Sequence, residues 1–281
     1  MSDITTSDGV RIRIHELRTG TDNLLLLHGV GRAARTFASY ATQLPSRFRI
    51  RAIDFRGHGD SGRAPDRYQV VDYVHDALAA VDAIGGRLVI HGHSLGALVS
   101  MAVAASRPDA IQAVVLEDPP STSYWQSLAS TNYFPTFRAM QQLAGQQVSV
   151  SELARQFGKC EVKTFSDGRV LRIVDVRDPI SLRFTAACLR DLDPDVMQAV
   201  LADNWPAGFD FDGLLQSIQC PVLLLRGDVA KGGMLPDDDA THIMSLLCDG
   251  VRMDFANAGH LLHWQVRSDL ATNVSAFLDS L

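Results

Sequence analysis

A short apolar run that leads into a glycine-rich turn constrains the fold more than any other part of the chain. Residues 88–90 are Leu-Val-Ile, the pentapeptide Gly-His-Ser-Leu-Gly fills 92–96, and small residues dominate 97–105. This order predicts a buried strand, a sharp turn and a helix. Side chains in place of the two glycines would meet the adjoining backbone, so the glycines favour a turn that lifts Ser94 above the sheet edge.

This position makes Ser94 a predicted nucleophile. A residue at the start of a helix lies beside unpaired backbone N–H groups and the positive end of the helix dipole. Both favour the negative charge that develops when an acyl group is attacked. The alternative is that Ser94 only caps the helix in a glycine-rich turn, because short motifs also recur by chance.

The segments before Ser94 alternate between strand and helix patterns. An alternating segment over 9–15 predicts an edge strand, and the continuous apolar run 23–29 predicts a strand covered on both faces. A helix ending near Leu44, a strand over 49–54 and a helix over 68–84 follow. This rhythm predicts an α/β fold with a doubly wound, mainly parallel sheet, whose ligands bind beyond the carboxyl ends of the strands.

The simple alternation is lost after a strand predicted over 111–116. Residues 119–219 contain helical segments and a group of aromatic residues, and we expect them to form an inserted helical cap on a core of 1–118 and 220–281. Because a cap presents its apolar face to the cleft beneath it, four of its aromatic residues are expected to bind substrate: Tyr124, Trp125, Phe134 and Trp205. The sheet pattern then resumes, with strands over 221–228 and 251–255 and helices over 237–247 and at the end of the chain.

Composition narrows the classes of partner. The chain has 281 residues, 46% of them hydrophobic, and a net charge of −6. This charge gives no electrostatic reason to expect nucleic acid or an anionic membrane surface, and it suits a neutral small-molecule substrate better. Neither a signal peptide nor a membrane-spanning run is seen, so we expect a cytoplasmic monomer or homodimer without membrane contact.

The sequence favours neither a metal site nor a cofactor. The acidic run 237–239 is typical of the first turn of a helix. The four cysteines have no short spacing, which predicts reduced thiols and argues against a disulfide framework or a zinc site; they are Cys160, Cys188, Cys220 and Cys248.

In four separate segments the chain resembles the α/β-hydrolase fold family. They are Leu-His-Gly-Val-Gly over 27–31, Asp-Phe-Arg-Gly-His-Gly-Asp-Ser over 54–61, the pentapeptide over 92–96 and Ala-Gly-His over 258–260. They occur in the family's order and at its spacing, over nearly the whole chain. The resemblance implies the fold expected above and hydrolysis on Ser94, although some proteins with this fold have become receptors or binding proteins.

His260 is the expected catalytic base. It follows a glycine in the loop after the last predicted strand, and a neutral imidazole is the usual base for a serine hydroxyl. The backbone N–H groups of Val30 and Leu95 are the expected oxyanion donors. Other histidines are alternatives, although a histidine in a packed turn more often has a structural role; they are His28, His58, His91, His93 and His263.

The position of the acidic residue that would orient His260 departs from the family's usual pattern. Relatives commonly carry it three residues after the glycine that ends the strand over 221–228, and that position here is Ala230. Asp118, at the end of the strand over 111–116, is therefore the expected acid, as in some family members. Asp228 is the second choice, and Glu117 is less favoured because it points to the other side of its strand.

These residues predict a serine hydrolase that cleaves a carboxylic ester or lactone of a small, mostly apolar substrate through an acyl-enzyme on Ser94. A serine at this position argues against epoxide hydrolases and haloalkane dehalogenases, which need an aspartate there. A carbon–carbon bond hydrolase or a hydroxynitrile lyase on the same residues stays open, because the fold does not determine the bond. A ligand-binding protein with little turnover is a further alternative.

Overall fold

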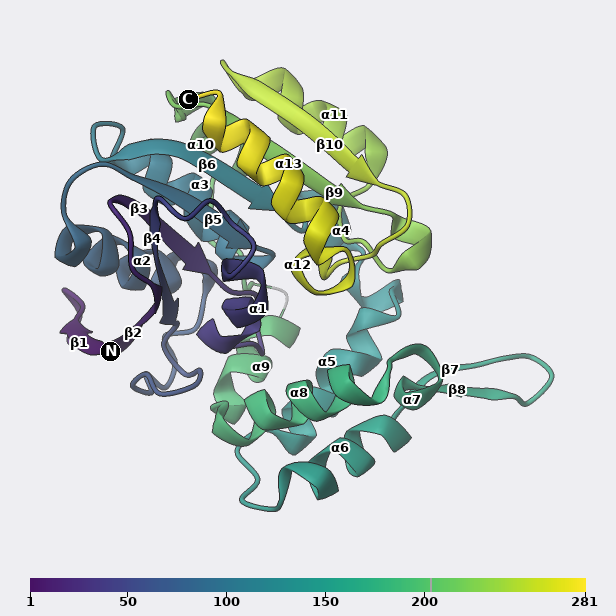
Figure 1. Ribbon diagram of the computed structural model, residues 1–281. Coiled ribbons are helices and arrows are strands. Elements are labelled where there is room, and N and C mark those ends of the chain that lie inside the picture. The colour runs from purple at the N-terminus through teal and green to yellow at the C-terminus, as the bar shows by residue number, and fades with distance from the viewer. Residues whose placement is uncertain (203) are drawn as a thin grey trace.

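The computed structural model describes residues 1–202 and 204–281, and a mixed sheet forms its centre (Figure 1). The strand order is β1-β2-β4-β3-β5-β6-β9-β10; β1, β2 and β4 pair antiparallel, and the other neighbours pair parallel. This confirms the predicted doubly wound, mainly parallel sheet. The strands are β1 (Ser2–Thr5), β2 (Arg11–Arg18), β3 (Asp22–Leu27), β4 (Phe48–Asp54), β5 (Leu88–His93), β6 (Ile111–Glu117), β9 (Val222–Gly227) and β10 (Gly250–Phe255).

The side chains of β3 alternate between two hydrophobic layers. Leu25 and Leu27 pack in the layer that contains α2, α3 and α11, whereas Leu24 and Leu26 pack in the layer of α1 and α13. Helices cover both faces, which is why this strand is a continuous apolar run. The core helices and turns are η1 (Ala34–Phe37), α1 (Ala38–Ala41), α2 (Val70–Ile84), α3 (Leu95–Ser106), η3 (Val229–Lys231), α11 (Asp237–Leu246), α12 (Leu262–Gln265) and α13 (Arg267–Asp279).

Two details of the core differ from the sequence prediction. β1 forms the edge of the sheet, so the strand predicted at the edge over 9–15 corresponds to β2, which pairs on both sides. Because the four residues of β1 are mostly exposed, no hydrophobic pattern marks it. The helix expected to end near Leu44 is instead the 3₁₀ turn η1 followed by the single turn α1. Among the described residues, no helix is both long and apolar enough to cross a membrane.

Most helices between β6 and β9 lie apart from the sheet, whereas α10 (Phe211–Ser217) packs on α3 and α11 of the core. The segment 119–219, predicted as an inserted cap, is called the cap below. In Figure 1, α5, α6, α8 and α9 lie together apart from the sheet, and a hairpin projects from them that the sequence analysis did not predict. Its strands are only three and four residues long and largely exposed. The cap elements are α4 (Thr122–Gln126), η2 (Leu128–Ser130), α5 (Tyr133–Leu143), α6 (Val150–Lys159), β7 (Glu161–Thr164), β8 (Val170–Arg172), α7 (Ile173–Val176), α8 (Pro179–Asp191), α9 (Pro194–Leu201) and α10 (Phe211–Ser217).

The turn between β5 and α3 holds Ser94 at a φ of 55°, in the left-handed region that a serine rarely adopts. A Cβ atom on Gly96 would overlap the carbonyl oxygen of Leu27, and one on Gly92 would overlap the carbonyl oxygen of Gly96. Both obstacles are backbone atoms, which cannot rotate away as a side chain can. The close approach of α3 to β3 therefore requires Gly96, and the close approach of α3 to β5 requires Gly92. Both glycines were predicted from the sequence to be needed for the turn at Ser94.

We expect Gly96→Ala to lower the free energy of unfolding by about 1–3 kcal/mol, because the added methyl has to displace backbone of the central sheet. Gly158→Ala in α6 is the matched control, since its Cβ would lie 3.4 Å from the Val174 Cβ, an ordinary contact. Urea unfolding of both variants measures the difference. Equal stability of the two variants would contradict the packing described here.

Candidate active site

The expected catalytic residues all lie at the carboxyl edge of the parallel strands. Ser94 follows β5, Asp118 follows β6, His260 lies in the loop after β10, and Val30 lies in the loop after β3. This edge is where the sheet order brings together loops that are distant in the sequence.

Asp118 and His260 are in direct contact. Asp118 Oδ2 lies 2.7 Å from His260 Nδ1 and also accepts the backbone N–H of Met234 at 2.8 Å. Asp118 Oδ1 accepts the N–H of Gly227 at 2.9 Å. The carboxylate is fully buried, so these three donors fix its orientation. A proton on Nδ1 that points to Asp118 leaves Nε2 of His260 as the free base.

Asp228, the second choice for the acid, has a different contact. Its Oδ1 accepts the backbone N–H of Ala230 at 2.9 Å and so caps the short turn η3. Among the described residues, the carboxylate within hydrogen-bond distance of His260 is that of Asp118.

Glu117 forms a separate network on the other side of β6. Its Oε1 lies 2.7 Å from His263 Nδ1, and its Oε2 lies 3.0 Å from His91 Nε2. Burial alone would raise the pKa of Glu117, but these histidines hold it well below its usual range. Glu117 therefore pairs with His91 and His263 and not with His260.

The remaining histidines hold turns together. His28 Nε2 accepts the N–H of Phe55 at 3.1 Å, and His58 Nε2 accepts the N–H of Gly31 at 3.0 Å. Burial lowers the pKa of His28 to about 4 and that of His58 to about 3, so both stay neutral and can accept. His93 Nε2 lies 2.8 Å from the carbonyl oxygen of His260 and supports the loop that carries it.

Ser94 and His260 line one small cavity beneath the cap, of about 40 Å³. The Ser94 hydroxyl makes no hydrogen bond to the described residues, and catalytic hydrogen bonds are often absent or long when no substrate is bound. A larger groove of about 340 Å³ has five lining residues in common with this cavity: Tyr133, Thr136, Arg177, His260 and Leu261. The groove and the cavity at Ser94 are therefore adjacent.

Two backbone N–H groups are available beside Ser94. Leu95 is the first residue of α3, so its N–H has no partner within the helix. In the loop after β3, Gly31 and Arg32 donate to His58 and Gly29, whereas Val30 donates to no acceptor in the described part of the chain. Both residues therefore have the donor that an oxyanion hole needs.

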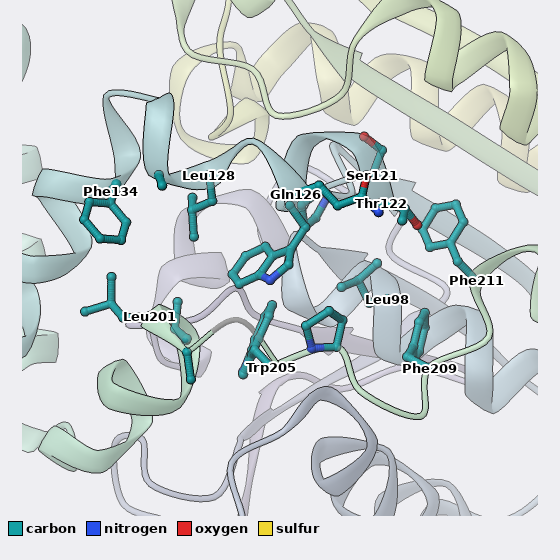
Figure 2. A pocket seen from close by; sticks show the side chains of 16 residues that line it. Leu98, Ser121, Thr122, Gln126, Leu128, Phe134, Leu201, Trp205, Phe209 and Phe211 are labelled. Carbon is teal, nitrogen blue, oxygen red and sulfur yellow. The ribbon is translucent and has the colours of Figure 1, made fainter.

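The aromatic residues expected to bind substrate lie mainly around a different cavity. Trp125, Trp205 and Phe134 line a space of about 550 Å³ between the cap and α3, shown in Figure 2, and Ser94 and His260 are not among its lining residues. Trp205 is almost fully buried and donates from Nε1 to the carbonyl oxygen of Tyr68 at 2.9 Å. Tyr124 is buried and lines neither this cavity nor the one at Ser94.

The sequence analysis assigned no role to three residues that line the Ser94 cavity. Tyr133 of α5 lies over His260, with ring centroids 5.8 Å apart, and Arg32 and Arg177 contribute two positive charges. The one sequence signal for Arg32 is its position two residues after Val30, the expected oxyanion donor. Arg177 and Tyr133 belong to the cap, where no motif marks them.

One buried group has the composition of a metal site. Ligand atoms of His93, Glu117 and His263 lie within 4.8 Å of one another. Glu117 already accepts from His263, and His93 donates to the backbone of His260, so hydrogen bonds within the protein occupy most of these atoms. The donor set fits a structural polar network better than a cation site.

Asp118→Asn should reduce kcat for ester hydrolysis by about 10⁴, the loss seen when a serine protease loses its acid, because His260 would lose control of its tautomer. Asp228→Asn is the matched control and should cost little activity, since that side chain caps a turn. Steady-state kinetics of the two purified variants make the comparison. The reverse order of effects would move the acid role to Asp228.

Comparisons with known proteins agree with this fold. The chain is 34% identical over 110 residues to 2-(acetamidomethylene)succinate hydrolase of Mesorhizobium japonicum, covering 38% of this chain and 40% of that protein. It is 25% identical over 207 residues to (E)-2-((N-methylformamido)methylene)succinate hydrolase of Acinetobacter baylyi, covering 73% and 71%. In these matches the chain spans only part of the length of some curated relatives: about half (51%) of one and 40% of another.

Solved structures and a family model cover more of the chain. The enol-lactonase of Burkholderia xenovorans LB400 superposes with a TM-score of 0.73 at 18% identity, over 99% of this chain and 100% of that one, which shows a shared fold. The model of the alpha/beta hydrolase family matches residues 24–272. The chain therefore belongs to the alpha/beta hydrolase family.

Proposed function

We propose that this protein is a serine hydrolase that cleaves a carboxylic ester or lactone through an acyl-enzyme on Ser94. The contact of 2.7 Å between Asp118 and His260, beside the strained turn of Ser94, is the observation that supports this most. A nucleophile, a base and an acid from three loops at one sheet edge are the parts that acyl transfer needs.

In the proposed first step, Ser94 Oγ forms a bond with the carbonyl carbon while its proton passes to His260 Nε2. Asp118 stabilises the resulting imidazolium through Nδ1–H, and the N–H groups of Val30 and Leu95 bind the oxyanion. When the tetrahedral intermediate collapses, the bond to the alcohol breaks and the alcohol takes the proton from His260.

In the second step, water attacks the acyl-enzyme. His260 accepts a proton from the water, and the new oxyanion forms in the same donor pair. The bond to Ser94 then breaks, Ser94 takes its proton back from His260, and the carboxylic acid is released. A lactone follows the same path, except that its alcohol stays attached to the acyl group.

Names of similar proteins support hydrolysis of an acyl or related bond. They include an enol-lactonase, a thermophilic esterase and two hydrolases of substituted methylenesuccinates. Because the identities are low or the matched regions partial, these names support the reaction class more than the substrate.

Labelling with a fluorophosphonate probe tests the nucleophile. We expect the purified protein to be labelled on Ser94 and Ser94→Ala to be unlabelled, with ester turnover reduced at least about a thousandfold. The thermal midpoint should hardly change, because the substitution removes one hydroxyl that makes no hydrogen bond to the described residues. Turnover above about one hundredth of wild type in Ser94→Ala would exclude Ser94 as the nucleophile.

A panel of esters and lactones then separates an enzyme from a binding protein. An enzyme should turn over at least one member in a manner that depends on Ser94. Tight ligand binding without turnover and without labelling would contradict the hydrolase proposal.

A further inference from the structure

Two arginines line the cavity that contains Ser94 and His260. Arg32 belongs to the loop after β3 in the core, and Arg177 belongs to the cap, directly after α7. Arg32 is 8% exposed, and Arg177 is half-buried. Core and cap thus each place one guanidinium beside the proposed nucleophile.

Neither arginine has an acidic partner among the described residues, because no carboxylate oxygen lies within 4.0 Å of either side chain. Arg32 donates to Thr185 Oγ1 at 3.2 Å and lies over the ring of Phe184, 5.5 Å from its centroid. A guanidinium has five N–H donors, so most of those on Arg32 are free to bind a ligand.

Arg56 shows how this protein otherwise buries an arginine. Its guanidinium is fully buried, and it pairs with Asp76 at 2.7 Å and with Asp8 at 2.8 Å. Those carboxylates raise the pKa of Arg56 above its usual value despite burial. The arginines beside Ser94 lack this compensation.

The uncompensated charge has an energetic cost. Burial lowers the pKa of Arg32 to about 10, and the nearby charge of Arg177 lowers it in addition. Burial also lowers the pKa of Arg177, against smaller opposing effects of Tyr133 and Asp178. A buried cation without a partner is unfavourable, and a second like charge makes it more so. An anion bound between them would relieve both costs.

We propose that the Ser94 site takes substrates that carry a carboxylate, and that Arg32 and Arg177 bind this group. The inference rests on the hydrolase function proposed above and specifies its substrate class. A planar carboxylate matches the fork of a guanidinium with two parallel hydrogen bonds. The same groups could also bind a phosphate, and the experiment below includes inorganic phosphate to distinguish the two anions.

This substrate class differs from the neutral substrate expected from composition and from the mostly apolar one expected from the aromatic residues of the cap. A net charge of −6 describes the whole surface, whereas the cavity at Ser94 has two cations in its lining. Binding is governed by the local charge, because charges on a distant surface are screened by solvent and salt.

Two methyl esters of matched shape test the proposal. Monomethyl succinate carries a carboxylate where methyl levulinate carries a neutral acetyl group. We expect the wild-type kcat/KM to be higher for monomethyl succinate. Arg32→Gln and Arg177→Gln should each lower that value by about ten- to a hundredfold, the range of a hydrogen bond to a charged group, and lower kcat/KM for methyl levulinate by a much smaller factor.

Arg35→Gln is the matched control, because Arg35 belongs to the same segment but lies on the surface, paired with Asp191 at 3.1 Å. Arg35→Gln should leave kcat/KM for both substrates unchanged. If Arg32 only anchors the cap through Thr185 and Phe184, Arg32→Gln will lower the thermal midpoint and reduce kcat/KM for both substrates by the same factor. That result would overturn the proposal.

Binding to Ser94→Ala separates this inference from the hydrolase function. Calorimetric titration should detect binding of monomethyl succinate to Ser94→Ala. Adding the Arg32→Gln change should weaken this binding. If the protein prefers methyl levulinate to monomethyl succinate, the carboxylate site is wrong. Labelling of Ser94 in the wild-type protein would then still support the hydrolase function. Tighter binding of inorganic phosphate would reassign the arginines to a phosphate group. Absence of binding by both esters and phosphate would overturn an anion site altogether.

Discussion

The Asp118 carboxylate is the interaction on which the arrangement of the site depends. It accepts hydrogen bonds from His260, from the end of β9 at Gly227 and from the following loop at Met234. These groups are distant in the sequence and meet only because β6 and β9 are neighbours in the sheet. The buried side chain of Asp118 therefore links the segment after β9 to the loop after β10 and orients the imidazole of His260.

Two consecutive acidic residues at the end of β6 serve two different histidines. Glu117 contacts His263, and Asp118 contacts His260, on opposite sides of the strand end. Alternation along a strand separates the two carboxylates, so neither histidine competes for the partner of the other. The same periodicity allowed the sequence analysis to favour Asp118 over Glu117.

The core could be predicted from the sequence because its signals are local. The continuous apolar run of β3, the glycines around Ser94 and the glycine before His260 each specify a backbone shape without knowledge of distant residues. The expected contact between Asp118 and His260 followed from two such strand ends, and the structure contains it. Their catalytic roles stay predictions until the variants are measured.

The cap could not be predicted in the same way, because its side chains are placed by contacts with the core. An aromatic residue in an amphipathic cap helix has the same sequence pattern whether it faces Ser94 or packs on α3. Tyr133 faces His260, whereas Trp205 packs in a separate cavity. The cavity at Ser94 is instead lined by Arg32 and Arg177. No sequence pattern indicates that these arginines have no acidic partner among the described residues, because ion pairs depend on the folded structure.

The same loop that supports the acid also contacts the cap. Met234 donates its N–H to Asp118, and two residues earlier the carbonyl oxygen of Gly232 accepts the hydroxyl of Tyr133 at 2.7 Å. Tyr133 also lies over His260 and lines the cavity at Ser94. Tyr133 therefore links the cap helix α5 to the loop that supports Asp118, although it belongs to neither the nucleophile turn nor the acid–histidine pair.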